Sequence, residues 1–218
     1  MPDAPLPEHA RYDDGVNRAR AHIESARKYH QELFGSLPKG MWPAEGAVSH
    51  AALSLLAEHG VQWAATGQGV LANSLIKSHL SAEDRHQYLY QPYRVTNGKN
   101  DVLCFFRDDA LSDKIGFEYA KMHSTDAVND FMRNLDEILA ATPKGQCKVV
   151  SVILDGENAW EYYPYNGYYF LKELYQALAN HSAITMTTFS DIIKMQHTGQ
   201  LPPAKILPQV SAGSWVYG

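Results

Sequence analysis

The sequence is poor in cysteine and shows no metal-binding pattern. Two cysteines, Cys104 and Cys147, occur among 218 residues, and neither a CxxC pair nor a cysteine–histidine spacing typical of zinc is present. Because both lie in or beside apolar runs, we expect buried, reduced thiols rather than a disulfide. The ten histidines are scattered, without an HExxH motif. We therefore predict a protein with no metal site and no cofactor.

The sequence also lacks an excess of positive charge and any apolar run of membrane-spanning length. The 24 Asp and Glu outnumber the 19 Lys and Arg, which gives a formal net charge of −5. This balance disfavours a nucleic-acid-binding surface and is compatible with a neutral, diffusible substrate. No signal-peptide-like segment is visible. We predict a cytoplasmic protein with no nucleic-acid partner and no membrane partner.

The composition is that of one globular domain with many aromatic residues. Hydrophobic residues make up 45% and charged residues 20% of the chain, whose length suffices for a sizeable core. The 13 Tyr and four Trp weakly favour a function that involves stacking on a ligand. No repeat, low-complexity tract or linker divides the chain. We therefore predict a single domain over residues 1–218.

Apolar runs alternate with segments of helical periodicity along the chain. Strands are expected at residues 40–43, 61–65, 102–106, 147–154 and 184–188. Helices are expected from Asp13 or Asp14 to residue 34 and over residues 48–59, 126–141, 168–180 and 189–196, with a less regular helical stretch ending near residue 90. Residues 91–99 contain a Pro and an Asn-Gly turn signal, residues 111–117 are expected to form a loop or a short turn, and a loop is expected from residue 198 onward. This alternation predicts an α/β fold with a parallel sheet or barrel.

The most informative stretch is VVSVILDGENAWEYYPYNG, residues 149–167. Its opening apolar run is typical of a strand buried on both faces, and Asp155 follows at the end of that strand. Sites of parallel α/β proteins lie beyond the carboxyl ends of the strands. Trp160 and several tyrosines come next, and carboxylates beside flat aromatic faces suit a sugar site. The run alone leaves open an ordinary Asp-Gly turn over a packed aromatic cluster.

Charged residues follow three of the expected strands. Glu45 comes after the first strand, Arg107 and Asp108 follow the third directly, and Asp155 follows the fourth. In a barrel of parallel strands, these carboxyl ends share one mouth. We therefore expect the charged side chains to meet in a common site.

Five segments of the sequence, taken together, resemble the catalytic domain of glycoside hydrolase family 57. They are GMWPAEGAVS at residues 40–49, WAAT at 63–66, FRDDALSDKIGF at 106–117, LDGENAWE at 154–161 and GSW at 213–215. The family contains α-amylases, amylopullulanases, 4-α-glucanotransferases and α-glucan branching enzymes, and the chain is most similar to the amylase and amylopullulanase branch. The resemblance implies a (β/α)7-type barrel, incomplete here with about five strand–helix units, and a substrate of the α-glucan class such as starch or glycogen.

The resemblance also implies two catalytic carboxylates. The glutamate of the Trp-Pro-x-Glu motif, the nucleophile of the family, corresponds to Glu45, and the aspartate of the Asp-Gly-Glu-Asn motif, the general acid/base, corresponds to Asp155. In a retaining glycosidase these two carboxyl groups lie about 5–5.5 Å apart. Asp155 must carry a proton near neutral pH, and the charges of Glu157 and Asp108 could favour that protonated form.

Other residues are weaker candidates for substrate binding. The rings of Trp42, Trp160 and Trp215 could stack on sugars, or they could simply pack inside the barrel. Arg107 and Asp108 could contact substrate hydroxyls, although we favour a structural ion pair that holds the mouth together. Glu157 completes the predicted site.

Two motifs of the family are missing from this chain, namely an early His-containing strand motif and a second motif before the nucleophile. Thr66-Gly67-Gln68 also stands where many members carry acidic residues. We expect the chain to be the C-terminal part of a family barrel, with the missing N-terminal part as a possible partner. An open barrel exposes sheet edges, so we predict poor solubility or weak activity for residues 1–218 alone. Full α-glucan hydrolysis by this segment would refute that prediction.

Two other functions remain open at this point. A non-catalytic relative or inactive fragment would bind α-glucan through its aromatic residues without cleaving it. A metal-dependent carbohydrate deacetylase or mannosidase on a related barrel would need a cluster of His and Asp at the strand ends, which the sequence does not show.

Overall fold

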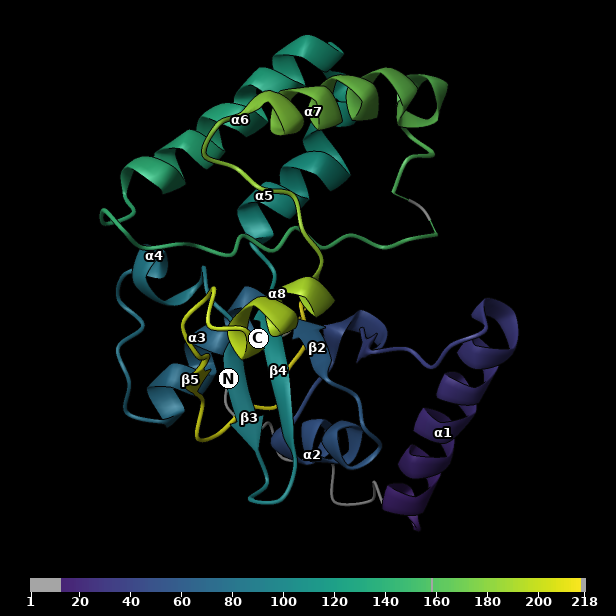
Figure 1. The fold of residues 1–218 in the computed structure, drawn as a ribbon. Helices are drawn as coiled ribbons and strands as arrows, with labels where there is room; N and C mark the ends of the chain where they lie inside the picture. The colour runs from purple at the N-terminus through teal and green to yellow at the C-terminus, as the bar shows by residue number, and fades with distance from the viewer. Residues whose placement is uncertain (1–12, 158, 217–218) are drawn as a thin grey trace. The chain divides into compact units, whose positions relative to one another are not determined.

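The computed structural model describes residues 13–157 and 159–216, and the chain divides into two compact units. Unit 1 comprises Met1–Phe106 and Phe189–Gly218, and unit 2 comprises Arg107–Thr188. All five strands that the structure describes belong to unit 1, whereas unit 2 is built from helices and irregular segments (Figure 1). The two units are described separately below.

Unit 1 contains one five-stranded sheet in the order β1-β2-β4-β3-β5. The strands are β1 (Gly40–Met41), β2 (Trp63–Thr66), β3 (Tyr93–Thr96), β4 (Asp101–Phe106) and β5 (Lys205–Ile206). The pairs β1–β2, β2–β4 and β3–β5 are parallel, and only β3–β4 is antiparallel among these described strands. The α/β class with a mainly parallel sheet is therefore confirmed. The described strands leave the sheet open, with β1 and β5 at its edges.

Five helices of unit 1 are described, and only the second, third and fifth of them contribute buried residues to its core. They are α1 (Gly15–Phe34), α2 (His50–Glu58), α3 (Gln68–Lys77), α4 (Arg85–Tyr88) and α8 (Phe189–His197). Helix α8 is fixed to the sheet by Phe189, whose ring stacks on Phe105 of β4 at 4.1 Å and meets Trp63 of β2 edge-on at 5.0 Å. The apolar residues of β2 and β4 are almost all buried, which explains why these strands were visible in the sequence.

Strands β3 and β4 form a hairpin around the Asn-Gly signal. Gly98 adopts a positive φ of 85°, and the Asn97 side chain accepts hydrogen bonds from the backbone N–H groups of Lys99 and Asn100. The turn was expected from the sequence, but no strand was assigned where β3 lies. The alternation of buried Tyr93 and Val95 with exposed Arg94 is the strand signal that was overlooked.

Unit 2 is centred on two long helices, α6 (Ser124–Ala140) and α7 (Tyr168–Asn180), which pack side by side (Figure 1). Phe131 of α6 and Phe170 of α7 are both buried. The unit also contains α5 (Asp109–Asp113), a π-helical turn (Lys114–Glu118) and two short 3-10 helices (Tyr119–Lys121 and Pro164–Gly167). Residues 111–117, expected to form a loop or a short turn, instead belong to α5 and the π-helical turn, and Asp108 caps α5.

Two expected strands, at residues 147–154 and 184–188, are not strands in the structure. The first is held by side chains instead of a sheet neighbour, since Ser112 Oγ accepts from the Ile153 N–H and Arg107 Nε donates to the Ile153 carbonyl. The second is mostly exposed, including Met186. An apolar run indicates that the side chains of a segment favour burial, but the segment joins a sheet only if its backbone pairs with a neighbouring strand.

The helix predictions were more accurate than the strand predictions. Five of the expected helices correspond to α1, α2, α6, α7 and α8, with ends that differ by at most two residues. The irregular stretch before residue 90 resolves into α3 and α4, and the C-terminal region expected to be loop contains β5. No described helix combines the length and the apolar character needed to cross a membrane.

The two cysteines are free and lie in different environments. Cys104 in β4 is buried, and burial raises the pKa of its thiol to about 12. Cys147 is exposed, so the expectation that both thiols are buried was wrong for this residue. The apolar run that begins at Val149 follows it in the irregular segment that does not join the sheet.

Candidate active site

Glu45 occupies a short 3-10 turn, Ala44–Gly46, directly after β1. Its backbone is left-handed, with φ 56° and ψ 18°, and its side chain is exposed. A non-glycine residue rarely adopts this conformation, which costs on the order of 1–3 kcal/mol unless surrounding contacts impose it. We call Ala44–Gly46 the Glu45 turn, and its contacts show what imposes the conformation.

The Glu45 turn is held from two sides by segments far away in sequence. Thr66, the buried last residue of β2, donates a 2.6 Å hydrogen bond to the Gly46 carbonyl. The Trp215 backbone N–H donates to the Glu45 carbonyl at 3.1 Å. An antiparallel bridge between Val48 and Gly213 fixes the same C-terminal segment beside the turn. The position of Glu45 is thus set by the sheet and by the C-terminal segment together.

The Trp215 side chain binds the Glu45 carboxylate directly. The indole Nε1–H donates to Glu45 Oε2 at 2.7 Å, a distance typical of hydrogen bonds to an ionised acceptor. Indole has no acceptor nitrogen, so this contact requires an oxygen that accepts. The contact orients one carboxylate oxygen while Glu45 as a whole stays exposed to solvent.

The ring of Trp42 packs beside the Glu45 turn together with the ring of Trp215. Its ring meets the Trp215 ring at 5.4 Å with an interplanar angle of 70°. It also covers Gly46, where a Cβ would approach within 2.8 Å of the Trp42 ring. A similar close approach exists at Gly67, where a Cβ would lie 2.9 Å from the Trp215 Cα. Gly67, which the sequence analysis noted only as part of a departure from the family, therefore leaves room for Trp215 beside Glu45.

Asp155 lies in unit 2, half-buried, at the end of the segment of residues 149–154. Arg107 holds this segment in place, because its Nε donates a 2.9 Å hydrogen bond to the Ile153 carbonyl. The same guanidinium pairs with Asp109 at 3.0 Å and with Asp113 at 2.6 Å, and its side chain is only 6% exposed. Arg107 therefore ties α5 to the backbone two residues before Asp155.

Asp108 also makes structural contacts within unit 2. It is 1% exposed, its Oδ1 accepts from the Leu111 N–H at 3.1 Å, and its own N–H donates to the Ser151 carbonyl at 2.8 Å. These contacts hold local geometry, and the ion pair that we favoured between Arg107 and Asp108 stays a prediction. Asp108 thus caps α5 and anchors the segment that leads to Asp155.

Trp160 is packed against the inner face of α7. Its ring lies 5.5 Å from Tyr163 and 6.3 Å from Phe170, and a Cβ at Gly167 would come within 3.1 Å of it. Burial raises the pKa of Tyr163, whose hydroxyl donates to the Ile115 carbonyl. The contacts of Trp160 correspond to the packing alternative considered for this residue. Glu157 is exposed in the turn that follows Asp155.

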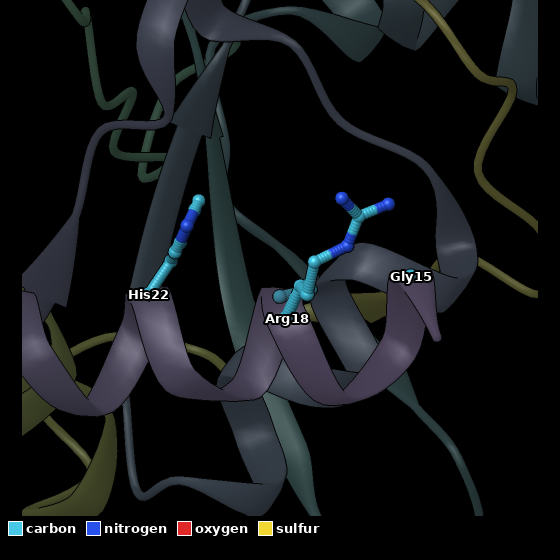
Figure 2. A pocket seen from close by; sticks show the side chains of 4 residues that line it. Gly15, Arg18 and His22 are labelled. Carbon is cyan, nitrogen blue, oxygen red and sulfur yellow. The ribbon is translucent and has the colours of Figure 1, made fainter. Parts of the chain in front are cut away.

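The predicted site residues therefore form two groups, one in each unit. Glu45, Trp42 and Trp215 are in direct contact in unit 1, and Asp155 is held by the Arg107 and Asp108 network in unit 2. Within the described residues, no group of three His, Cys, Asp or Glu could hold a metal ion. A pocket lined by Gly15, Arg18, Ala19 and His22 lies along α1, and none of these residues belongs to either group (Figure 2).

Comparison with known proteins decides the family. The sequence model described as Glycosyl hydrolase family 57 matches residues 10–209. The chain belongs to glycosyl hydrolase family 57. A comparison with curated proteins finds no sequence match. The two motifs that carry Glu45 and Asp155 both lie within the matched range.

Solved structures of family 57 enzymes share the fold at low sequence identity. The 4-alpha-glucanotransferase from Thermococcus litoralis matches with a TM-score of 0.64 and 18% identity over 90% of this chain. The alpha-amylase AmyC from Thermotoga maritima gives 0.66 and 15% over 91%, and the GH57-type branching enzyme from Pyrococcus horikoshii gives 0.69 and 14% over 90%. The chain spans only 28%, 47% and 43% of these three structures, respectively. The likeness confirms the incomplete (β/α)7-type architecture, with the sheet open among the described residues.

Proposed function

We propose that this family 57 chain carries the two catalytic carboxylates of a retaining glycoside hydrolase or transglycosidase that acts on α-glucans. The observation that carries the proposal is the Glu45 carboxylate, exposed yet oriented by the Trp215 indole at 2.7 Å. Family membership and the pair of specific motifs support the same conclusion. The similar structures include a 4-alpha-glucanotransferase and a GH57-type branching enzyme.

In the proposed reaction Glu45 is the nucleophile. One carboxylate oxygen attacks the anomeric carbon and forms a glycosyl ester, while the glycosidic oxygen departs and takes the proton of Asp155. Asp155 then removes a proton from water, which attacks the same carbon and releases Glu45. If a sugar hydroxyl replaces water, the product is a transferred glucan chain. Two displacements at one carbon retain its configuration.

The hydrogen bond from Trp215 has a defined role in this scheme. It holds the Glu45 carboxylate in one orientation before substrate arrives, so less conformational freedom is lost on reaching the transition state. The rings of Trp42 and Trp215 flank the turn and offer apolar faces to the sugar. Trp160 supports the segment after Asp155 by packing, and Arg107 and Asp108 hold the segment before it.

The two roles can be assigned by azide rescue with an activated substrate. We expect Glu45→Gly to lose turnover of an α-maltosyl fluoride and to regain it with azide, giving the β-configured azide because a single displacement inverts the carbon. Asp155→Ala should retain turnover of the fluoride, which needs no protonation to leave, and give the α-configured azide. Glu161→Ala, an exposed acid six residues beyond Asp155, is the matched control and should behave like the wild type.

A non-catalytic α-glucan-binding relative is the other reading. It predicts that the wild-type chain binds maltooligosaccharides and turns over no fluoride, and that Glu45→Gln binds equally well. Turnover by the wild type, lost in Glu45→Gln with binding retained, contradicts it. Assignment to the amylase and amylopullulanase branch rests on motif similarity, and the cytoplasmic location stays a prediction of the sequence.

A further inference from the structure

Five exposed tyrosines outside the proposed active site lie close together in the sequence of unit 2. They lie between Trp160 and Gln176, where Phe170 and Leu174 are buried. The exposed fractions are 79% for Tyr162, 76% for Tyr165, 59% for Tyr168, 50% for Tyr169 and 57% for Tyr175. Every large hydrophobic residue exposed in this stretch is a tyrosine, so the surface combines apolar rings with hydroxyl groups.

Three of these residues, Tyr165, Tyr168 and Tyr169, form a contiguous group that we call the tyrosine cluster. The Tyr165 and Tyr169 rings meet edge to face at 5.2 Å and 85°, and the Tyr168 and Tyr169 rings meet at 5.2 Å and 83°. Such contacts restrict the rings to defined positions. Tyr168 and Tyr169 begin α7, whose opposite side is anchored in the core by Phe170. The cluster is therefore exposed but fixed to a rigid element.

The backbone under the cluster is unusual. Tyr165 and Asn166 have φ values of 53° and 52°, and Gly167 follows with 77°. A left-handed conformation is costly for a tyrosine and persists only where neighbouring structure imposes it. Here the Asn166 N–H donates to the Tyr163 carbonyl, and Gly167 lies against the Trp160 ring. Buried neighbours thus maintain a strained loop that carries Tyr165 on the surface.

We propose that the tyrosine cluster is a binding site for an α-glucan chain, made of residues other than those proposed for catalysis. The flat faces of the rings suit the C–H faces of glucose, and the hydroxyls can exchange hydrogen bonds with sugar hydroxyls. Rings inclined at 83° and 85° present a stepped surface, which fits a curved α-1,4-linked chain better than a flat β-1,4-linked one. The choice of glucan rests on the proposed function.

Charge disfavours an anionic occupant for the same surface. Lys172 is the only Lys or Arg between Lys148 and Lys194 in the sequence. A nucleic acid would require several cationic groups beside stacking rings. A neutral polymer needs no cationic groups, because stacking on each ring adds to its affinity without any contribution from charge.

The proposal is tested by electrophoresis of the full chain through gels that contain glycogen. We expect the wild type to be retarded, and Tyr165→Ala and Tyr168→Ala each to weaken the apparent affinity, by about tenfold when combined. Because both residues are mostly exposed, truncation removes no core packing, and circular dichroism checks the fold. Tyr29→Ala, an exposed tyrosine of α1 in unit 1, is the matched control and should migrate like the wild type.

Soluble oligosaccharides provide a second readout. Calorimetry should detect maltoheptaose binding and no cellohexaose binding, with the first weakened by the same two variants. Retardation that is absent in the wild type or unchanged in the combined variant overturns the proposal. Turnover of α-maltosyl fluoride should be the same in the tyrosine variants and the wild type, so failure of the catalytic proposal would appear separately, as absent turnover with intact glycogen binding.

Discussion

Among single residues, Trp215 and Glu45 make the contact on which the proposed chemistry depends. They lie 170 positions apart in the sequence and are joined by a side-chain hydrogen bond and a backbone hydrogen bond. An exposed glutamate without such a partner samples several rotamers, and ordering it costs free energy. The indole therefore prepares Glu45 for attack before substrate binds.

Replacing Trp215 by phenylalanine keeps an aromatic ring and removes the N–H donor. We expect Trp215→Phe to lower kcat for α-maltosyl fluoride by roughly tenfold to a hundredfold, the loss of one hydrogen bond to a charged group, with little change in KM. Steady-state kinetics measures the effect.

Trp63→Phe provides the control for this substitution. Trp63 Nε1 also donates a side-chain hydrogen bond, to Ser190 Oγ at 3.1 Å, but in the contact between β2 and α8. Its loss should lower stability and leave kcat of the folded protein unchanged. Equal kcat losses in Trp63→Phe and Trp215→Phe would show that the indole of Trp215 has no special role.

The motifs identified the candidate carboxylates, whereas their surroundings could not be predicted from the sequence. Glu45 and Asp155 follow from the family resemblance. For Trp215 the sequence left open whether the ring stacks on sugar or packs in the barrel, and its hydrogen bond to Glu45 became visible only when the C-terminal segment was placed beside β2. The Tyr-rich stretch likewise gave no indication of which rings are buried, because that depends on the backbone turn at Tyr165.

Among secondary-structure elements, the segment of residues 149–154 shows how side chains can replace a sheet neighbour. Arg107 binds the Ile153 carbonyl and two aspartates through three different nitrogens. Lysine offers one nitrogen and lacks the planar fork. We expect Arg107→Lys to lower the free energy of unfolding by about 2–3 kcal/mol, measured by urea denaturation, and to reduce activity through the displaced Asp155.

Arg133→Lys is the corresponding control. Arg133 is a mostly exposed residue of α6 that pairs with Asp130 three residues earlier, and surface pairs of this kind contribute about 0–1 kcal/mol. If Arg107→Lys proved as harmless as Arg133→Lys, Arg107 would not be what holds the segment before Asp155.

Asp130 on α6 predicts a specific pH dependence. The hydrogen bond from Lys114, with a further one from Tyr119, lowers the pKa of Asp130 below its usual 3.8, although partial burial opposes this. Folding therefore favours the carboxylate, and its contribution to stability is complete above the unfolded pKa and disappears as the pH falls through the lower native pKa. Asp130→Asn should destabilise the protein by about 2 kcal/mol at pH 7.

The measurement is urea unfolding of the wild type and Asp130→Asn between pH 7 and pH 3. The difference between the two should shrink as the pH falls below about 4, because the unfolded wild type then takes up a proton at this carboxyl while the folded state still favours the carboxylate. A difference that stays constant down to pH 3 would contradict the assigned role of Asp130.

Helices were easier to predict than strands for a physical reason. A helix satisfies its own backbone, so the periodicities of α6 and α7 were sufficient. A strand requires a neighbour elsewhere in the chain, and the apolar runs at residues 147–154 and 184–188 find none in the described structure. Strand β3 was predictable in principle from the alternation around Asn97-Gly98.

Considered as a whole, the chain combines a unit with an open sheet and a helical unit. The α/β class and the first three parallel strands could be predicted from the sequence, whereas β5 at the sheet edge could not be assembled from local patterns. The single domain over residues 1–218 stays a prediction, as does weak activity of this segment alone. Family 57 membership and the three similar folds place the chain beside enzymes of much greater length.

Covalent trapping tests the central claim most directly, because it detects even a single slow turnover. The protein is incubated with 5-fluoro-α-glucosyl fluoride, whose glycosyl ester hydrolyses slowly, and then digested and analysed by peptide mass spectrometry. We predict a sugar adduct on the peptide that contains Glu45, absent in Glu45→Gln and formed more slowly in Trp215→Phe. An adduct on another carboxylate, or fluoride release by the wild type with no adduct at Glu45, would contradict the account.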